Sequence, residues 1–374
     1  MRDQTPSVRG VLTAAEIAQT AASIVAMQEP DGAVPWTVGA HVDVWNHVEA
    51  AMALLAAGEV DAAERAYEWC RRTQRADGSW PMKVVAGVVE DASGETNMSA
   101  YLAVGIWHHW LIRRDRGYVE RFWPVVRRAL DFVEGMQLSF GGIAWSQEWN
   151  DGAPAGINRD ALVAGSSSIY QSLRAGVALA EIVGEPQPAW ELAGGRLGHA
   201  VRVHRDLFLD KGTFSMDWYY PVLGGAVRGD AGRALIDTRW DDFVVPGLGI
   251  RCVDTNPWVT GADTCELALA LDALGDRPRA VRLFADMQHL RDPGGGYWTG
   301  YVYPDQVNWP AEHTTYTAAA VVLAADALAA GEGHGTPGSG IMRGETLIAG
   351  FAELDLECGC ASADRVSRTS AHAR

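Results

Sequence analysis

Two apolar patterns alternate along the chain. Residues 13–27 repeat apolar side chains every three or four positions, which predicts an amphipathic helix with one face on a core. Residues 44–57 are apolar on nearly every side, which predicts a buried helix. The alternation then continues: further amphipathic helices are expected at residues 60–74, 118–137, 188–206, 231–243 and 277–290, and further apolar helices at 95–112, 166–183, from 215, 261–274 and 312–330.

Six amphipathic and six apolar helices close most simply into a ring, with the apolar helices inside and the amphipathic ones outside. We therefore predict an all-α fold, an (α/α)6 barrel, over residues 13–331. An open solenoid is the competing architecture, but it would need polar capping repeats, and neither terminus resembles one. Residues 1–12 are expected to form an N-terminal extension, and the Gly-rich polar residues 332–374 a partly disordered C-terminal tail.

A short motif recurs in the loops that lead into the apolar helices. Its clearest copy is Gln74-Arg75-Ala76-Asp77-Gly78-Ser79-Trp80, in which a Gln ends a helix and a Gly turn precedes a Trp. Related copies stand at Gln28, Asp31, Gly32 and Trp36, at Gln137, Gly141 and Trp145, and at Gln288, Asp292, Gly294 and Trp298. A motif repeated in this way identifies a helical repeat protein.

Composition narrows the function classes. The net charge of −16 argues against binding to nucleic acid or anionic membranes, so we expect a small-molecule substrate. The N-terminal residues lack a secretion signal and no apolar run reaches about 18 residues, so stable membrane insertion is not expected. Five cysteines form no even-numbered framework, which favours the cytoplasm. The sequence leaves the oligomeric state open.

The chemistry is expected where the apolar helices begin. In a double ring all inner helices start on one face, and their free N–H groups point at the mouth of the central cavity. Asp, Ser, Thr and Asn at these starts suit helix caps. Capping does not explain Glu49, Asn97, Glu266 and Tyr316, which fall within the first turns of helices predicted to be buried. A buried carboxylate needs a partner or a function.

One set of residues fits a metal site. Asp263, Cys265 and His313 could give Zn²⁺ a carboxylate, a thiolate and an imidazole, the three protein ligands that a catalytic zinc site requires. Zinc is the one cofactor that the sequence suggests. The alternative interpretation is that Cys265 is an ordinary small buried residue and that His313 is a hydrogen-bond donor at the rim.

The repeats resemble those of the terpenoid cyclase and protein prenyltransferase superfamily over residues 13–330. Asp263-Thr264-Cys265 and His313-Thr314-Thr315-Tyr316 are similar to the zinc-ligand segments of the prenyltransferase β-subunits, which implies zinc at Asp263, Cys265 and His313 and Tyr316 nearby. Ala262 stands where protonating cyclases carry their proton donor, which argues against cyclisation of that type. The resemblance implies a prenyltransferase-like enzyme that acts on an isoprenoid or another small hydrophobic substrate in bacterial biosynthesis.

A carbohydrate-active enzyme is the main alternative. Such enzymes also use (α/α)6 barrels, and glycoside cleavage needs a pair of carboxyl groups. Asp217 together with Asp263 or Glu266 is the first candidate pair. Aromatic rings could stack on sugars or stabilise an allylic cation. Candidate platforms are Trp45, Trp218, Trp258, Trp298 and Trp309. A binding ring without catalysis is the third interpretation.

The candidate site residues follow from these observations. The candidate catalytic residues are Asp217, Asp263, Glu266, His313 and Tyr316. The candidate substrate-binding residues are Trp45, His47, Glu49, Glu95, Asn97, Trp218, Tyr219, Arg251, Trp258 and Trp298. The candidate zinc ligands are Asp263, Cys265 and His313. All of them are expected to gather at the mouth of the barrel.

Overall fold

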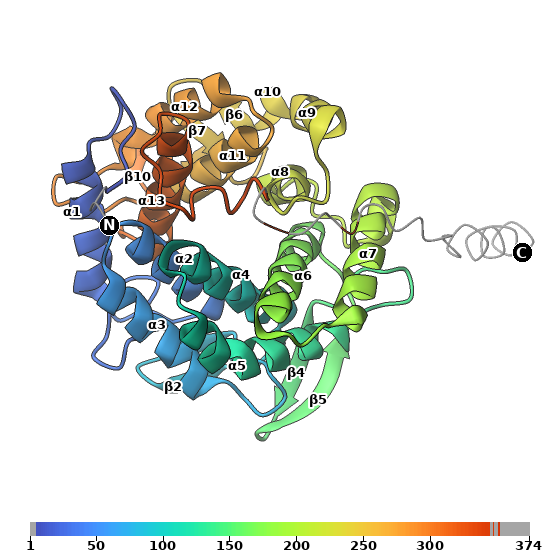
Figure 1. The fold of residues 1–374 in the computed structure, drawn as a ribbon. Helices are drawn as coiled ribbons and strands as arrows, with labels where there is room; N and C mark the ends of the chain where they lie inside the picture. Colours follow the sequence, from blue (N-terminus) through green and yellow to red (C-terminus); the bar gives the residue numbers. More distant parts are fainter. Residues whose placement is uncertain (1–4, 345–346, 348–350, 352–374) are drawn as a thin grey trace, which may run out of the picture.

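Inner helices form a closed ring in the computed structural model, which describes residues 5–344, Leu347 and Phe351 (Figure 1). The inner helices are α2 (Val44–Ala56), α4 (Thr96–Arg113), α6 (Val163–Val183), α8 (Ser215–Leu223), α11 (Gly261–Ala273) and α13 (Thr315–Ala330). Each packs against the next in this order, and α13 packs against α2. The ring is therefore closed, which confirms the predicted all-α (α/α)6 barrel and rules out the open solenoid.

Outer helices surround this ring and turn their apolar faces toward it. They are α1 (Ala14–Met27), α3 (Val60–Thr73), α5 (Arg116–Glu134), α7 (Pro188–Val203), α9 (Gly229–Thr238), the short α10 (Trp240–Phe243) and α12 (Arg277–Asp286), with 3-10 turns at Arg205–Leu207 and Met287–Leu290. On α3, for example, Ala63, Ala66 and Cys70 are fully buried while Arg71 and Arg72 stay in solvent. Within the described residues no helix is long and apolar enough to cross a membrane.

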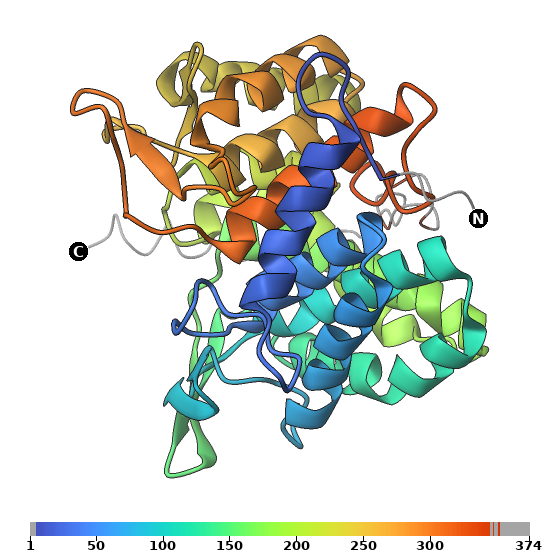
Figure 2. The ribbon, with the colours of Figure 1, turned by 90° about the vertical axis from the view of Figure 1, so that its left-hand side faces the viewer.

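Short antiparallel sheets lie in the loops that lead into the inner helices, and the sequence did not predict them. They comprise β1 (Lys83–Val85) with β2 (Val88–Asp91), β3 (Gly94–Glu95) with β4 (Ser146–Asn150) and β5 (Ala153–Asn158), and the row β6 (Val244–Val245), β7 (Gly249–Arg251), β8 (Trp258–Thr260), β9 (Gly300–Val302) and β10 (Val307–Asn308). In Figure 2 the hairpins project from the left side of the ring. This side carries the N-termini of the inner helices, and we call it the mouth.

In three of its four copies the recurring motif ties its turn to the next outer helix. Gln74 donates from Nε2 to the carbonyl oxygen of Gly78 at 3.0 Å and to that of Val125 on α5 at 2.9 Å. Gly78 has φ +97, and a Cβ there would lie 2.0 Å from the Arg128 carbonyl oxygen, so only glycine fits. Equivalent bonds from Gln28 and Gln137 join their turns to α3 and α7. The motif therefore builds the ring and does not itself form a reaction site.

A segment after α13 closes the end of the barrel opposite the mouth. Gln171 on α6 donates from Nε2 to the Ile341 carbonyl oxygen at 3.3 Å, and Arg228 donates to that of Met342 at 2.7 Å. The side chains of Ile341 and Met342 are buried there. This part of the predicted tail packs on the barrel, whereas residues 352–374, for which disorder is predicted, lie outside the described residues.

Candidate active site

Three tyrosine hydroxyls converge on one buried carboxylate just inside the mouth. Tyr220 on α8 and Tyr316 on α13 each donate to Oε1 of Glu266 at 2.7 Å. Tyr219 donates to the other oxygen, Oε2, of the same carboxylate. Glu266 lies in the second turn of α11, so hydrogen bonds from the two neighbouring inner helices, α8 and α13, fix its orientation. Hydrogen bonds to the ionised form stabilise a carboxylate.

A second carboxylate stands beside it at the start of α11. Asp263 accepts hydrogen bonds from the Ser215 hydroxyl at 3.0 Å and the Tyr219 hydroxyl at 3.3 Å on Oδ1, and from the Thr260 hydroxyl on Oδ2. Burial raises the pKa of Asp263, although these hydroxyls oppose the shift. Asp263 thus accepts three hydroxyl hydrogen bonds, and the Tyr219 hydroxyl links it to Glu266.

A third carboxyl group, Glu49 on α2, shares a cavity with Glu266. Trp45, Tyr101 and Tyr220 line this cavity as well, and Met342 reaches it from the closed end of the barrel. The Trp45 and Tyr101 rings, which line this cavity, stack with centroids 3.8 Å apart. Two neighbouring carboxyl groups are what glycoside cleavage uses.

Burial raises the pKa of both carboxyl groups in this cavity. It raises the pKa of Glu266 to about 7, with the Asp263 charge adding to the shift and the tyrosine hydroxyls opposing it. It raises the pKa of Glu49 well above the usual range, and the charge of Glu266 adds to that shift. Burial thus favours the protonated form of Glu49, while the pKa of Glu266 lies where that group can gain or lose a proton near neutral pH.

Further acidic side chains lie at the rim, each held by a tryptophan. Trp36 donates from Nε1 to Glu312 at 2.8 Å, and Trp145 donates from Nε1 to Glu95 at 2.8 Å. Burial raises the pKa of Glu95 to about 7. Asn97 lies half-buried two residues further on. The structure thus places the predicted binding residues Glu95 and Asn97 at the start of α4, on the mouth side.

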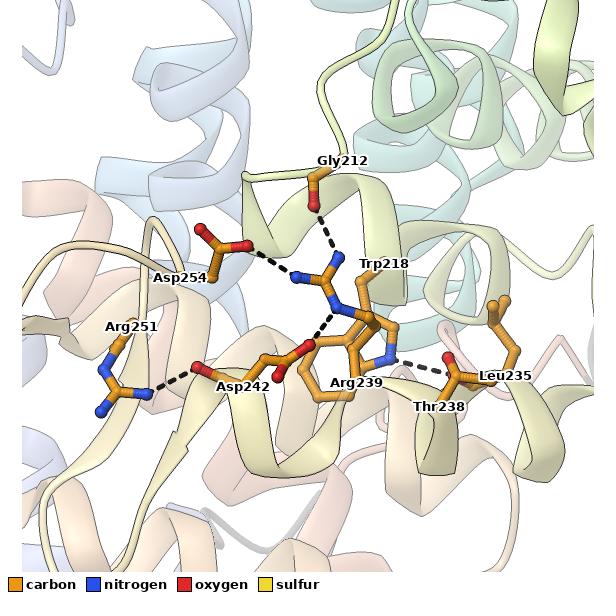
Figure 3. A network of polar contacts seen from close by, with 8 residues as sticks. All are labelled: Gly212, Trp218, Leu235, Thr238, Arg239, Asp242, Arg251 and Asp254. Atoms are coloured by element: carbon orange, nitrogen blue, oxygen red, sulfur yellow. Dashed lines mark hydrogen bonds and ion pairs between the residues drawn. The ribbon is translucent and has the colours of Figure 1, made fainter.

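Asp217 and Trp218 are not part of this cavity. Asp217 accepts a hydrogen bond from the Ala164 backbone N–H at 3.3 Å, and it lines a separate pocket with Arg205 and Lys211. Trp218 stacks on Phe243 and donates to the Leu235 carbonyl oxygen at 3.0 Å (Figure 3). The structure therefore places Asp217 in a different pocket from Glu266 and does not support the predicted pairing of Asp217 with Asp263 or Glu266.

Two further predicted binding residues have structural roles. His47 is fully buried, accepts the Val34 backbone N–H at 3.0 Å on Nδ1 and contacts the Ala66 carbonyl oxygen through Nε2 at 2.7 Å. Arg251 donates to the Asp242 carbonyl oxygen and to the Tyr303 hydroxyl. Figure 3 shows Arg251 next to the ion pairs that Arg239 makes with Asp242 and Asp254. Neither side chain lines the cavity of Glu266.

The predicted zinc ligands are not brought together. Asp263 and Cys265 are two positions apart on a helix, so their side chains face different directions. Cys265 is fully buried, and His313 packs on Trp298 with ring centroids 4.0 Å apart. Across the described residues no three His, Cys, Asp or Glu side chains form a group that could hold a metal ion.

The other predicted residues lie at or near the mouth. Trp258, Trp298 and His313 are half-buried in the loops before α11 and α13, and the Nε1 of Trp258 donates to the Trp309 carbonyl oxygen at 2.8 Å. Sequence reasoning missed Tyr101 and Tyr220 as parts of the cavity. Their signal is a tyrosine within an otherwise apolar helix, where its hydroxyl needs a buried partner.

Comparisons with known proteins identify a close relative. The chain is 55% identical over 363 residues to the MMP endo-(1,4)-3-O-methyl-alpha-D-mannosidase of Mycolicibacterium hassiacum, covering 97% of this chain and 98% of that protein. No model of a known protein family matches the chain.

Solved structures with the same fold include a glycosidase in complex with glucose, at a TM-score of 0.65 and 16% identity, covering 84% of this chain and 97% of that one. A GH63 mannosylglycerate hydrolase from Thermus thermophilus follows at 0.62 and 14%, covering 82% and 99%. At such low identity these structures show the fold alone.

The relative overturns the resemblance to terpenoid cyclases and prenyltransferases, together with the transferase activity that it implied. The shared Gln and Gly motif misled the prediction because it stabilises contacts between repeats, whatever reaction the barrel carries. The alternative of a carbohydrate-active barrel agrees better with the comparisons. With more than half of its residues identical over nearly its whole length, the chain belongs to the family of the MMP endo-(1,4)-3-O-methyl-alpha-D-mannosidase of Mycolicibacterium hassiacum.

Proposed function

We propose that this protein is a glycoside hydrolase that cleaves internal (1→4) linkages between 3-O-methyl-α-D-mannose units. The substrate class rests on the 55% identity to the mannosidase. The observation that supports the reaction is the shared cavity of Glu49 and Glu266, in which burial pushes both carboxyl pKa values upward and three phenols favour the ionised form of Glu266.

Glu49 acts as the general acid in this proposal. Its proton passes to the glycosidic oxygen as the bond between that oxygen and the anomeric carbon breaks. Burial raises the pKa of Glu49 well above its usual range, which favours the protonated form that a general acid needs. Trp45 and Tyr101 line the same cavity.

Glu266 acts as the general base. It takes a proton from the water molecule whose oxygen bonds to the anomeric carbon, so the configuration at that carbon inverts. Both of its oxygens already accept phenol hydrogen bonds, two on Oε1 and one on Oε2. Oε2 accepts only one of these hydrogen bonds, so it keeps a lone pair for the water proton.

Matched amide variants test this assignment. Glu49→Gln and Glu266→Gln should each lower the hydrolysis rate of (1→4)-linked 3-O-methyl-α-mannose oligosaccharides by about 10²- to 10⁴-fold, measured as new reducing ends. Asp326→Asn is the control, because Asp326 is a buried carboxylate bound to Thr336 outside the cavity. If either Gln variant kept wild-type activity while folded, its assigned role would be refuted.

The cellular compartment belongs to the same proposal. Cys70, Cys252 and Cys265, the cysteines in the described residues, form no disulfide. Free and mostly buried thiols suit a reducing compartment. We therefore propose a cytoplasmic enzyme that acts on a glycan of the same compartment.

A further inference from the structure

Exposed apolar side chains gather on the loops of the mouth. We call six of them the apolar rim: Val38, Val88, Val89, Ile157, Val307 and Trp309. Val38 is 77% exposed, Val88 68% and Trp309 55%. Among the described residues only Leu192 and Val203 are large exposed apolar side chains on a helix longer than one turn, and both lie on α7. Exposed apolar groups are therefore concentrated where a substrate would arrive.

The hairpins present these side chains in a fixed arrangement. Val88 and Val89 pair with Val85 and Val84 at the tip of the β1–β2 hairpin. Val84 also bridges to Val42, which ties this hairpin to the loop that carries Val38. Figure 2 shows the β1–β2, β4–β5 and β9–β10 hairpins projecting on the same side of the ring. The rim thus lies on the mouth side of the ring, because each of its residues stands in a loop or hairpin that leads into an inner helix.

The kind of side chain indicates the kind of ligand. Sugar hydroxyls are normally bound by hydrogen-bonding groups and by aromatic faces, and the inner cavity provides both. Five of the six rim residues are instead aliphatic, and aliphatic side chains cannot form a hydrogen bond with a sugar hydroxyl. A methyl ether has lost its hydroxyl donor and presents a methyl group, which gains by leaving water for an apolar surface.

We propose that the apolar rim binds the O-methyl groups of sugar units on either side of the cleaved bond. This inference rests on the proposed function and adds to it the part of the protein that selects a methylated chain. Burial of one methyl group is worth about fourfold in binding. Several units in contact with the rim would then distinguish methylated from unmethylated mannan, while the carboxylates in the cavity perform the same chemistry on either.

Substitution at the hairpin tip tests the rim. The measurement is kcat/KM on (1→4)-linked α-mannose oligosaccharides of equal length, with and without 3-O-methyl groups. Val88→Ser combined with Val89→Ser should lower the value on the methylated chain about tenfold, and change it less than about twofold on the unmethylated chain. Leu192→Ser on α7 is the control, because Leu192 is also an exposed aliphatic residue but lies near the start of this outer helix, at the end away from the mouth.

The outcomes separate this inference from the proposed function. If the double variant lost the same activity on both oligosaccharides, or lost none on either, the rim would not bind the methyl groups. If the wild-type protein cleaved neither chain, the proposed function would fail. The inference could still be tested by calorimetry, which would compare the binding of the same oligosaccharides to wild type and to the double variant. Equal affinities would overturn it. So would a wild-type dimer that the double variant converts to a monomer by sedimentation, since the rim would then be a subunit interface.

Discussion

At the residue scale, Glu266 and Glu49 give the activity a bell-shaped dependence on pH. The base must be ionised, and the pKa of Glu266 is raised to about 7, so kcat/KM should rise as the pH increases through about 7. The acid must be protonated, so activity should fall again as the pH increases through the raised pKa of Glu49. Tyr316→Phe removes a donor that favours the ionised base, and should move the acidic limb upward by about one pH unit. An acidic limb unmoved by this substitution would argue that another group is the base.

The sequence identifies polar residues in buried helices but not the directions in which they point. Glu49, Glu266 and Tyr316 were selected because polar groups in buried turns need partners, and the structure joins Tyr316 to Glu266. Cys265 was selected as a zinc ligand and Asp217 as one carboxyl group of a glycosidase pair, yet neither lines the cavity of Glu266. Whether such a residue lines the cavity depends on which side of its helix faces the barrel axis. That orientation is set by the packing of neighbouring helices.

At the element scale, the motif turns hold the outer ring together. Gly78→Ala should lower the free energy of unfolding by about 2 kcal/mol or more, because the residue has positive φ and its Cβ would meet the Arg128 carbonyl oxygen. Gly87→Ala is the control. It also has positive φ, but nothing lies within 4 Å of the added Cβ. Chemical denaturation of both variants measures the difference, and equal losses would mean that the contact with α5 contributes nothing.

Helices were predicted better than strands at this scale. The inner helices α6 and α11 begin within three residues of their predicted starts, because long apolar periods are read reliably. Strands such as β3, with two residues, are too short for a period of two to be visible, and a partner distant in sequence defines them. Several rim residues lie on these strands and hairpins, so the sequence could not indicate the rim.

At the scale of the whole molecule, the residues that hold the ring together differ from the residues proposed to carry the reaction. The turns at Gln28, Gln74 and Gln137 join successive repeats through the same carbonyl contacts, and these determined the fold correctly. The proposed acid Glu49 and the proposed base Glu266 lie elsewhere, on α2 and α11, where both line the same cavity. Resemblance in the turns therefore predicted the barrel and gave the wrong reaction.

The products of one digestion test the central claim most directly. We predict that the wild-type protein cuts a (1→4)-linked 3-O-methyl-α-mannose oligosaccharide at internal bonds, so mass spectrometry should find shorter oligosaccharides early in the reaction and little free 3-O-methylmannose. Glu266→Gln should leave the substrate intact. Release of single sugars from the chain end, or the same products from Glu266→Gln, would contradict an internal cleavage driven by the Glu49 and Glu266 pair.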